Sequence, residues 1–101
     1  MANELNRELQ GQVAIVTGAG LHTGSTIART LAAAGAAVVV NYRNAKEGAD
    51  STVADIRSAG GDAIAVQGDV TSESDVEKIV TETVSSYGTV SILVNNANVR
   101  N

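Results

Sequence analysis

The sequence contains no cysteine, no proline, no phenylalanine and no tryptophan, and it has only two tyrosines among its 101 residues. Without cysteine the chain has no disulfide framework and no thiolate metal site. The sequence therefore does not indicate an oxidising or a reducing compartment, and it is compatible with the cytosol. Hydrophobic residues make up 44% of the chain. With almost no aromatic residues, the core must be formed mainly by valine, isoleucine, leucine and alanine. This composition favours closely packed layers of sheet and helix over an aromatic-rich β-sandwich.

Positive charge and long apolar runs are also scarce. The formal net charge of −4 offers no basic surface for nucleic acid or for an anionic membrane. The first ten residues, MANELNRELQ, are polar and mixed in charge, unlike a signal peptide, and no apolar run approaches the length of a membrane span. We therefore expect one cytoplasmic domain over residues 1–101, with no nucleic-acid partner and no membrane partner.

Short apolar runs alternate with stretches whose apolar residues recur at helical spacing. The apolar runs, typical of strands covered on both faces, are Gln12–Thr17, Ala36–Asn41, Asp62–Gln67 and Thr89–Asn95. The expected helices begin at Gly24 and stop at Gly35, cover Ala45–Ala59, and run from a Ser72 cap, with Asp75 as the second half of a capping box, to Gly88. The apolar stripe of the third helix is formed by Val76, Ile79, Val80, Thr83, Val84 and Tyr87.

This alternation predicts an α/β fold with an open parallel sheet, because right-handed crossovers join parallel neighbours. We expect the Rossmann-like strand order 3-2-1-4, ending before a fifth strand. Ligands of such sheets bind beyond the carboxyl ends of the strands where the strand order reverses, here between the first and fourth strands. The segments TGAGLHTG and NNAN follow these two strands, so both are expected at the same crevice.

The first of these segments reads Gly18-x-Gly20-x-x-x-Gly24, which misses the strict G-x-G-x-x-G spacing because residue 23 is threonine. Gly18 can make the sharp exit from the strand, and Gly24 allows the helix to approach it closely. The helix then presents free amides and a partial positive charge to a diphosphate. The alternative is a glycine-rich turn that binds no ligand.

Three motifs at matching spacing resemble the N-terminal part of the short-chain dehydrogenase/reductase family. That family has T-G-x-x-x-G-x-G after the first strand, an acidic and a hydrophobic residue after the third, and N-N-A-G after the fourth. Thr17, Gly18 and Gly24 match the first motif, Asp69-Val70 matches the second, and Asn95-Asn96-Ala97 matches three letters of the last. The resemblance covers nearly the whole chain and implies a Rossmann-type fold, a nicotinamide dinucleotide and oxidoreductase chemistry.

The resemblance also implies the cofactor contacts. The glycine turn would hold the diphosphate, Asp69 would accept from the adenine amino group while the Val70 amide donates to the ring, and Asn96 with Ala97 would lie beneath the ribose. Asn95 would support the junction of the first and fourth strands. The expected contacts are Gly18, Gly20, Leu21, His22, Thr23, Gly24, Arg43, Asp69, Val70, Asn96, Ala97 and Asn98.

Two residues depart from the family pattern. His22 replaces the middle glycine of the first motif, and it either lies over the diphosphate or points to solvent without a role. Asn98 replaces the glycine of the third motif. Asparagine tolerates positive φ better than other non-glycine residues, but it adds bulk near the expected ribose and nicotinamide.

The segment NYRN, residues 41–44, bears on the choice of cofactor. An acidic residue here would bind the ribose hydroxyls and repel a 2′-phosphate, but Tyr42 stands in its place. Arg43 could clamp a phosphate through two parallel hydrogen bonds. This favours NADP(H), with NAD(H) possible; the alternative for Arg43 is a solvated loop cation.

No catalytic residue and no metal ligand set is expected within the chain. The family resemblance implies a tyrosine acid/base, a lysine four residues on and a serine, all on the fifth strand and the helix after it, beyond Asn101. A literal Y-x-x-x-K is present at Tyr42 and Lys46, but it lies at the adenine end, away from the hydride chemistry. The other tyrosine, Tyr87, is on the inward stripe of a helix.

The expected topology leaves the fourth strand as an apolar edge and leaves much of one sheet face bare. We therefore expect a homo-oligomer, formed through that strand or that face, or association with a separate C-terminal half. Three function classes remain open: a dinucleotide-binding half without catalysis of its own, an oxidoreductase whose other half is supplied elsewhere, and a non-catalytic structural or interaction module that has kept the fold and lost the cofactor.

Overall fold

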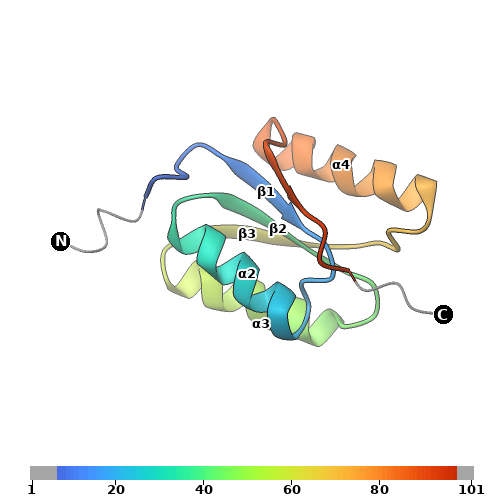
Figure 1. The fold of residues 1–101 in the computed structure, drawn as a ribbon, viewed down its shortest axis with the longest axis horizontal. Coiled ribbons are helices and arrows are strands. Elements are labelled where there is room, and N and C mark those ends of the chain that lie inside the picture. Colours follow the sequence, from blue (N-terminus) through green and yellow to red (C-terminus); the bar gives the residue numbers. More distant parts are fainter. Residues whose placement is uncertain (1–6, 98–101) are drawn as a thin grey trace.

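The computed structural model describes residues 7–97, which form one parallel sheet and three helices (Figure 1). The strand order β3-β2-β1-β4 confirms the predicted Rossmann-like topology. The elements are β1 (Val13–Val16), α2 (His22–Ala33), β2 (Ala37–Tyr42), α3 (Lys46–Ser58), β3 (Asp62–Gln67), α4 (Glu73–Tyr87) and β4 (Ile92–Val94).

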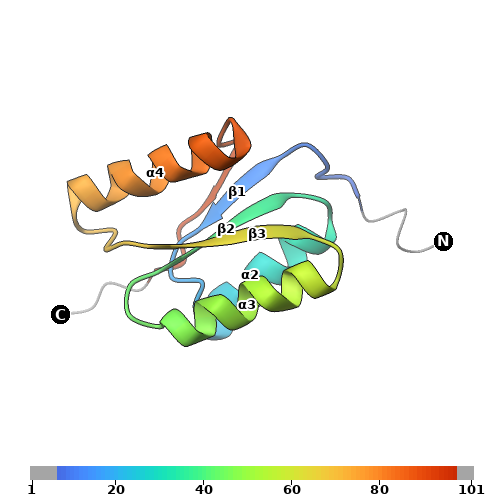
Figure 2. The same ribbon diagram turned by 180° about the vertical axis from the view of Figure 1, so that it is seen from behind.

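The helices form two layers around the sheet. Helices α2 and α3 lie side by side on one face, and α4 lies alone on the other, as the two opposite views show (Figures 1 and 2). The larger core cluster lies on the α2–α3 side and includes Val16, Val38, Val40, Val53 and Ile56. The smaller cluster lies on the α4 side and consists of Ile15, Val39, Val66 and Ile79. Apolar side chains of β1 and β2 therefore point to both faces, as expected for strands in a doubly covered parallel sheet.

Strand β1 is the centre of the sheet. All four of its residues are buried, and it pairs in parallel with β2 on one side and with β4 on the other. In this register Val16 lies opposite both Val40 and Val94. The carboxyl ends of these strands are thus level, and the loops that leave them emerge together.

Helix α4 follows the boundaries predicted for the third helix closely. The Ser72 side chain accepts a hydrogen bond from the Asp75 amide at 3.3 Å, and Gly88 ends the helix in the left-handed conformation at φ +86°. Helix α2 differs from the prediction for the first helix, since it begins at His22 and not at Gly24. The glycine turn is therefore shorter than expected, and part of it forms the first turn of α2.

The fourth strand and the stripe of α4 differ more from the sequence pattern. Strand β4 has three residues, because only Ile92–Val94 pair with β1. On α4, Ile79 and Thr83 are buried, whereas Val76, Val80 and Val84 are about two-fifths exposed. None of the helices within residues 7–97 combines the length and the hydropathy needed to cross a bilayer.

Candidate functional site

The loops that follow β1 and β4 meet at the carboxyl edge of the sheet. The Thr17 hydroxyl accepts hydrogen bonds from the amides of Asn96 and Ala97, both at 3.0 Å. The Asn96 side-chain amide donates to the carbonyl of Gly18 at 3.2 Å. The glycine turn and the NNA segment therefore lie in direct contact, at the predicted switch point of the sheet.

Asn41, the fifth residue of β2, ties this junction to the third strand. Its side chain is 1% exposed. The side-chain oxygen accepts from the Gly18 amide at 3.3 Å, and the side-chain nitrogen donates to the carbonyls of Val66 and Gly68, both at 3.2 Å. Sequence reasoning missed this role, because Asn41 looked like the polar end of an apolar run.

Close approach explains the glycines of the turn. A Cβ at Gly18, where φ is +62°, would lie 2.8 Å from the Ala97 Cα, and one at Gly20 would lie 2.9 Å from the Ala45 carbonyl oxygen. A Cβ at Gly24 would collide with the Gly18 carbonyl and with Asn96. Gly48 of α3, which the sequence analysis did not single out, is equally constrained, since its Cβ would overlap the Gly20 carbonyl.

No side chain caps the first turn of α2. Its cap residue, Leu21, makes no side-chain capping hydrogen bond, and no acidic residue occupies the first turn. The side chains of Leu21, His22 and Thr23 are exposed. Because the first amides of a helix have no intrahelical partner, this end of α2 carries unused donors and a partial positive charge. Such an end fits a phosphate.

His22 occupies the left-handed region at φ +57°, and it is the one non-glycine residue with positive φ within the described part of the chain. Left-handed geometry costs an L-residue about 1–2 kcal/mol, although histidine tolerates it better than most residues. This strain explains why a glycine suits the position.

We expect His22→Gly to raise the free energy of unfolding by about 0.5–1 kcal/mol, because the relief of backbone strain exceeds the entropy that glycine adds to the unfolded chain. Urea denaturation measures the change. The matched control is Thr23→Gly, at an exposed neighbour with no positive φ, which should lower stability. A lower stability for His22→Gly than for the wild type would contradict the strain.

The predicted adenine and 2′-phosphate residues lie together after β2 and β3. The Arg43 Nε is 3.5 Å from an Asp69 carboxylate oxygen, and the Arg43 side chain is 68% exposed. The other Asp69 oxygen accepts from the Thr71 hydroxyl at 2.7 Å and from the Thr71 amide at 2.9 Å. These hydrogen bonds, and then the charge of Arg43, hold the pKa of Asp69 below its usual value. Asp69 is therefore an ionised acceptor at neutral pH.

The remaining predicted contacts are divided between two surfaces. Asn96 and Ala97 are half-buried beside the glycine turn, but it is Asn96, and not Asn95, whose side chain braces the β1–β4 junction. Val70 and Asn95 line an apolar groove of about 240 Å³ between α4 and the sheet. Asn98 lies outside the described residues.

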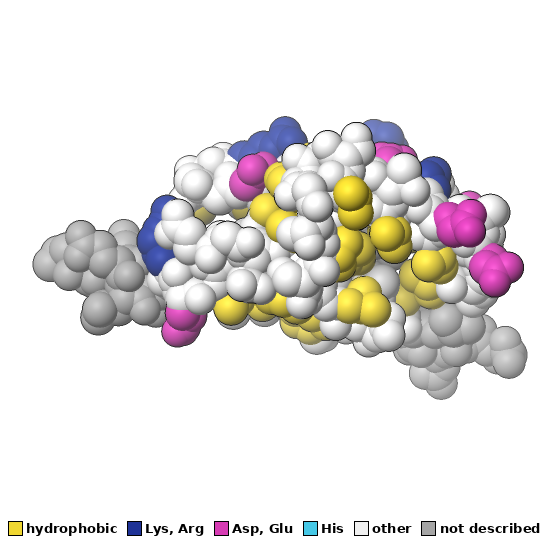
Figure 3. Space-filling model, turned by 90° about the horizontal axis from the view of Figure 1, so that it is seen from above, with side chains coloured by type: hydrophobic (Ala, Val, Ile, Leu, Met, Phe, Trp, Pro, Cys, Tyr) yellow, Lys and Arg dark blue, Asp and Glu magenta, His cyan; other side chains and the backbone are white. Residues whose placement is uncertain are grey.

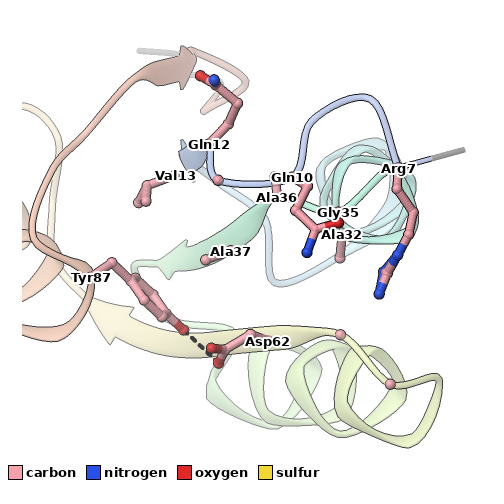
Figure 4. A pocket seen from close by; sticks show the side chains of 13 residues that line it. Arg7, Gln10, Gln12, Val13, Ala32, Gly35, Ala36, Ala37, Asp62 and Tyr87 are labelled. Carbon is pink, nitrogen blue, oxygen red and sulfur yellow. Dashed lines mark hydrogen bonds between the residues drawn. The ribbon is translucent and has the colours of Figure 1, made fainter.

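The two tyrosines lie at opposite edges of the sheet. Tyr42 ends β2, and the Lys46 ammonium pairs with Asp50 at 2.8 Å. Tyr87 lies at the opposite, amino edge of the sheet, where it lines a cavity of about 330 Å³ and donates to Asp62 at 2.9 Å (Figure 4). Burial, followed by the Asp62 contact, raises the pKa of Tyr87. Across residues 7–97, no three histidine, cysteine or acidic side chains gather as a metal site.

Comparison with known proteins agrees with this geometry. A family model described as short chain dehydrogenase matches residues 12–101. The chain is 49% identical over 92 residues to an uncharacterized oxidoreductase of Methylorubrum extorquens, with 91% of this chain and 37% of that protein covered. It is 43% identical over 91 residues to a 3-oxoacyl-[acyl-carrier-protein] reductase of Synechocystis, with 90% and 37% covered.

A shorter relative and a solved structure extend the comparison. The short-chain dehydrogenase/reductase homolog YusS of Bacillus subtilis is 44% identical over 88 residues, covering 87% of this chain and 81% of that protein. The crystal structure of a hydroxysteroid dehydrogenase from Escherichia coli superposes with a TM-score of 0.87 at 45% identity, covering 95% of this chain and 40% of that one. The chain thus spans well under half the length of most of these relatives. It belongs to the short-chain dehydrogenase family.

Proposed function

We propose that this chain is the cofactor-binding portion of a short-chain dehydrogenase, and that it binds NADP(H) in preference to NAD(H). The observation that carries the proposal is the contact between the glycine turn and the NNA segment, beside a helix end whose amides are unused within the described residues.

Each part of the cofactor has a matching group. The amides of the α2 first turn and the turn residues Gly20 and Leu21 would hold the diphosphate, while Asp69 and the Val70 amide would receive the adenine. Asn96 and Ala97 would lie beneath the ribose. Arg43 would bind the 2′-phosphate, because the position that an acidic residue would need in order to repel this phosphate is occupied by Tyr42.

The proposed cofactor contacts include no acid/base residue for hydride transfer. When bound, the nicotinamide would give a hydride to a carbonyl carbon or take one from an alcohol carbon. Tyr42 adjoins Arg43 at the proposed adenine end and Tyr87 lies at the amino edge of the sheet, so we propose that this chain binds cofactor without turning over substrate on its own. The cytoplasmic location expected from the sequence stays a prediction.

Isothermal titration of the 101-residue chain with NADPH and NADH tests this proposal. We expect NADPH to bind more tightly, and Arg43→Ala to weaken NADPH by about tenfold while changing NADH by less than about twofold, because a charge-assisted contact to the 2′-phosphate is lost. Arg29→Ala, which removes an exposed arginine paired with Asp55 on the α2–α3 layer, is the matched control. Absence of heat with both dinucleotides would favour the structural module.

We also propose that the apolar face beside α4 is covered by a second copy of the chain. Of the five large hydrophobic side chains exposed within residues 7–97, four belong to α4 and the adjacent edge strand: Val76, Val80, Val84 and Leu93. Figure 3 shows hydrophobic side chains gathered in the middle of this face. A symmetric pair would join two β4 edges and bring the two α4 stripes over each other's grooves.

Light scattering after size-exclusion chromatography should give twice the chain mass. Leu93→Glu should give the single-chain mass, because Leu93 is 60% exposed at the centre of β4 and a carboxylate would be buried in the contact. Ser51→Glu, on the exposed side of α3, is the control and should remain paired. A folded wild-type monomer at all concentrations would contradict the proposal.

A further inference from the structure

The ends of β2 and β3 form a small scaffold beneath the Arg43 loop. The last residue pair of the β2–β3 ladder is Tyr42 with Gln67. The Gly68 amide donates to the Tyr42 carbonyl at 2.9 Å, so the two strands stay together to their ends. One residue past the end of β2, the Gln67 side-chain nitrogen donates to the carbonyl of Arg43 at 3.1 Å. A side chain of β3 thus extends the ladder by one residue, onto the loop that carries the arginine.

Two contacts from the β3 side therefore meet at Arg43. Gln67 holds its backbone, and Asp69 faces its Nε at 3.5 Å. Because Asp69 lies on the Nε side of the guanidinium, its two terminal nitrogens are left for the oxygens of a phosphate, in the bidentate geometry with which arginine binds phosphate.

We infer that Gln67 is a positioning residue for the choice between NADP(H) and NAD(H), an inference that rests on the proposed cofactor site. Gln67 acts through the Arg43 carbonyl: its hydrogen bond holds the loop in the conformation that presents the guanidinium to the 2′-phosphate. The Gln67 amide is neutral, so its effect on cofactor affinity comes through the position of Arg43 and not through charge. Asp69 is less suited to a test, because its substitution would change the adenine contact and the local charge together.

The test is Gln67→Met, which keeps the length of the side chain and removes the donor. Titration of the 101-residue chain should show NADPH affinity lowered about threefold to tenfold, the range that one lost hydrogen bond produces, and NADH affinity changed by less than about twofold. In an Arg43→Ala background, Gln67→Met should change neither affinity. Gln12→Met, at an exposed glutamine just before β1, is the control and should resemble the wild type.

The outcomes separate the inference from the proposal beneath it. Equal losses for NADPH and NADH, or a loss that persists without Arg43, would assign Gln67 a general structural role and overturn the inference. Unchanged affinities in Gln67→Met would overturn it as well. A wild-type chain that binds neither dinucleotide would instead overturn the proposed function.

Discussion

Replacement of Gly18 by valine should abolish the binding of both NADPH and NADH. At φ +62°, a β-branched residue is strained, and a Cβ there would lie 2.8 Å from the Ala97 Cα. The side chain would push apart the two loops whose contact forms the proposed site and would fill space next to the diphosphate position. We expect no measurable heat of binding in isothermal titration, a loss of at least about a hundredfold for a micromolar ligand.

A loss of binding means little if the variant has unfolded, so Gly60→Val is the matched control. Gly60 also has a positive φ, +92°, but nothing lies within 4 Å of its Cβ position, and it follows α3 at the amino edge of the sheet. It should therefore lose a similar backbone-strain energy and still bind cofactor. If Gly18→Val binds NADPH while folded, or Gly60→Val loses binding while folded, the assignment of the site is wrong.

The largest loss of stability is expected at Asn41. Asn41→Asp keeps the acceptor that faces the Gly18 amide, but it places a carboxylate oxygen against the carbonyls of Val66 and Gly68. At pH 8 the variant should lose about 3 kcal/mol of unfolding free energy, because two buried acceptors lose their donor and a charge is buried.

The loss at Asn41 should also depend on pH. Burial raises the folded-state pKa of the introduced carboxyl above its unfolded value of about 4. The part of the penalty that comes from the charge is therefore absent well below pH of about 4, where both states are protonated, and it grows as the pH rises toward the folded-state pKa. The loss of one donor to the two carbonyls remains at every pH. Urea denaturation at pH 5 and pH 8 measures this difference. Asn44→Asp, the same substitution at an exposed position, should cost less than about 0.5 kcal/mol at either pH. A loss at Asn41 that is larger at pH 5 than at pH 8 would contradict the account.

Local patterns predicted most of the fold correctly. The run at β1 is apolar on both faces because the strand is central, and the Ser72 cap and the Gly88 end mark α4 by their own chemistry. These features depend on residues adjacent in sequence. The strand order followed from the alternation of elements and the handedness of crossovers.

Features that depend on distant partners were less predictable. The hydrogen bonds of Asn41 join it to residues 23, 25 and 27 positions away, and nothing in a single sequence shows such pairing. Strand β4 was predicted too long because its length is set by its pairing with β1. The stripe of α4 has helical spacing, but spacing shows only which residues share a face. It does not show that Val76, Val80 and Val84 lack cover within the described chain.

The most direct test is an NMR titration of the ¹⁵N-labelled chain with NADPH. If the end of α2 holds the diphosphate, the amides of His22, Thr23, Gly24 and Ala97 should shift most, while those of Gly60 and Gly88, at the opposite edge, should stay fixed. Shifts confined to the amino edge of the sheet, or binding that leaves the α2 amides unchanged, would contradict the account.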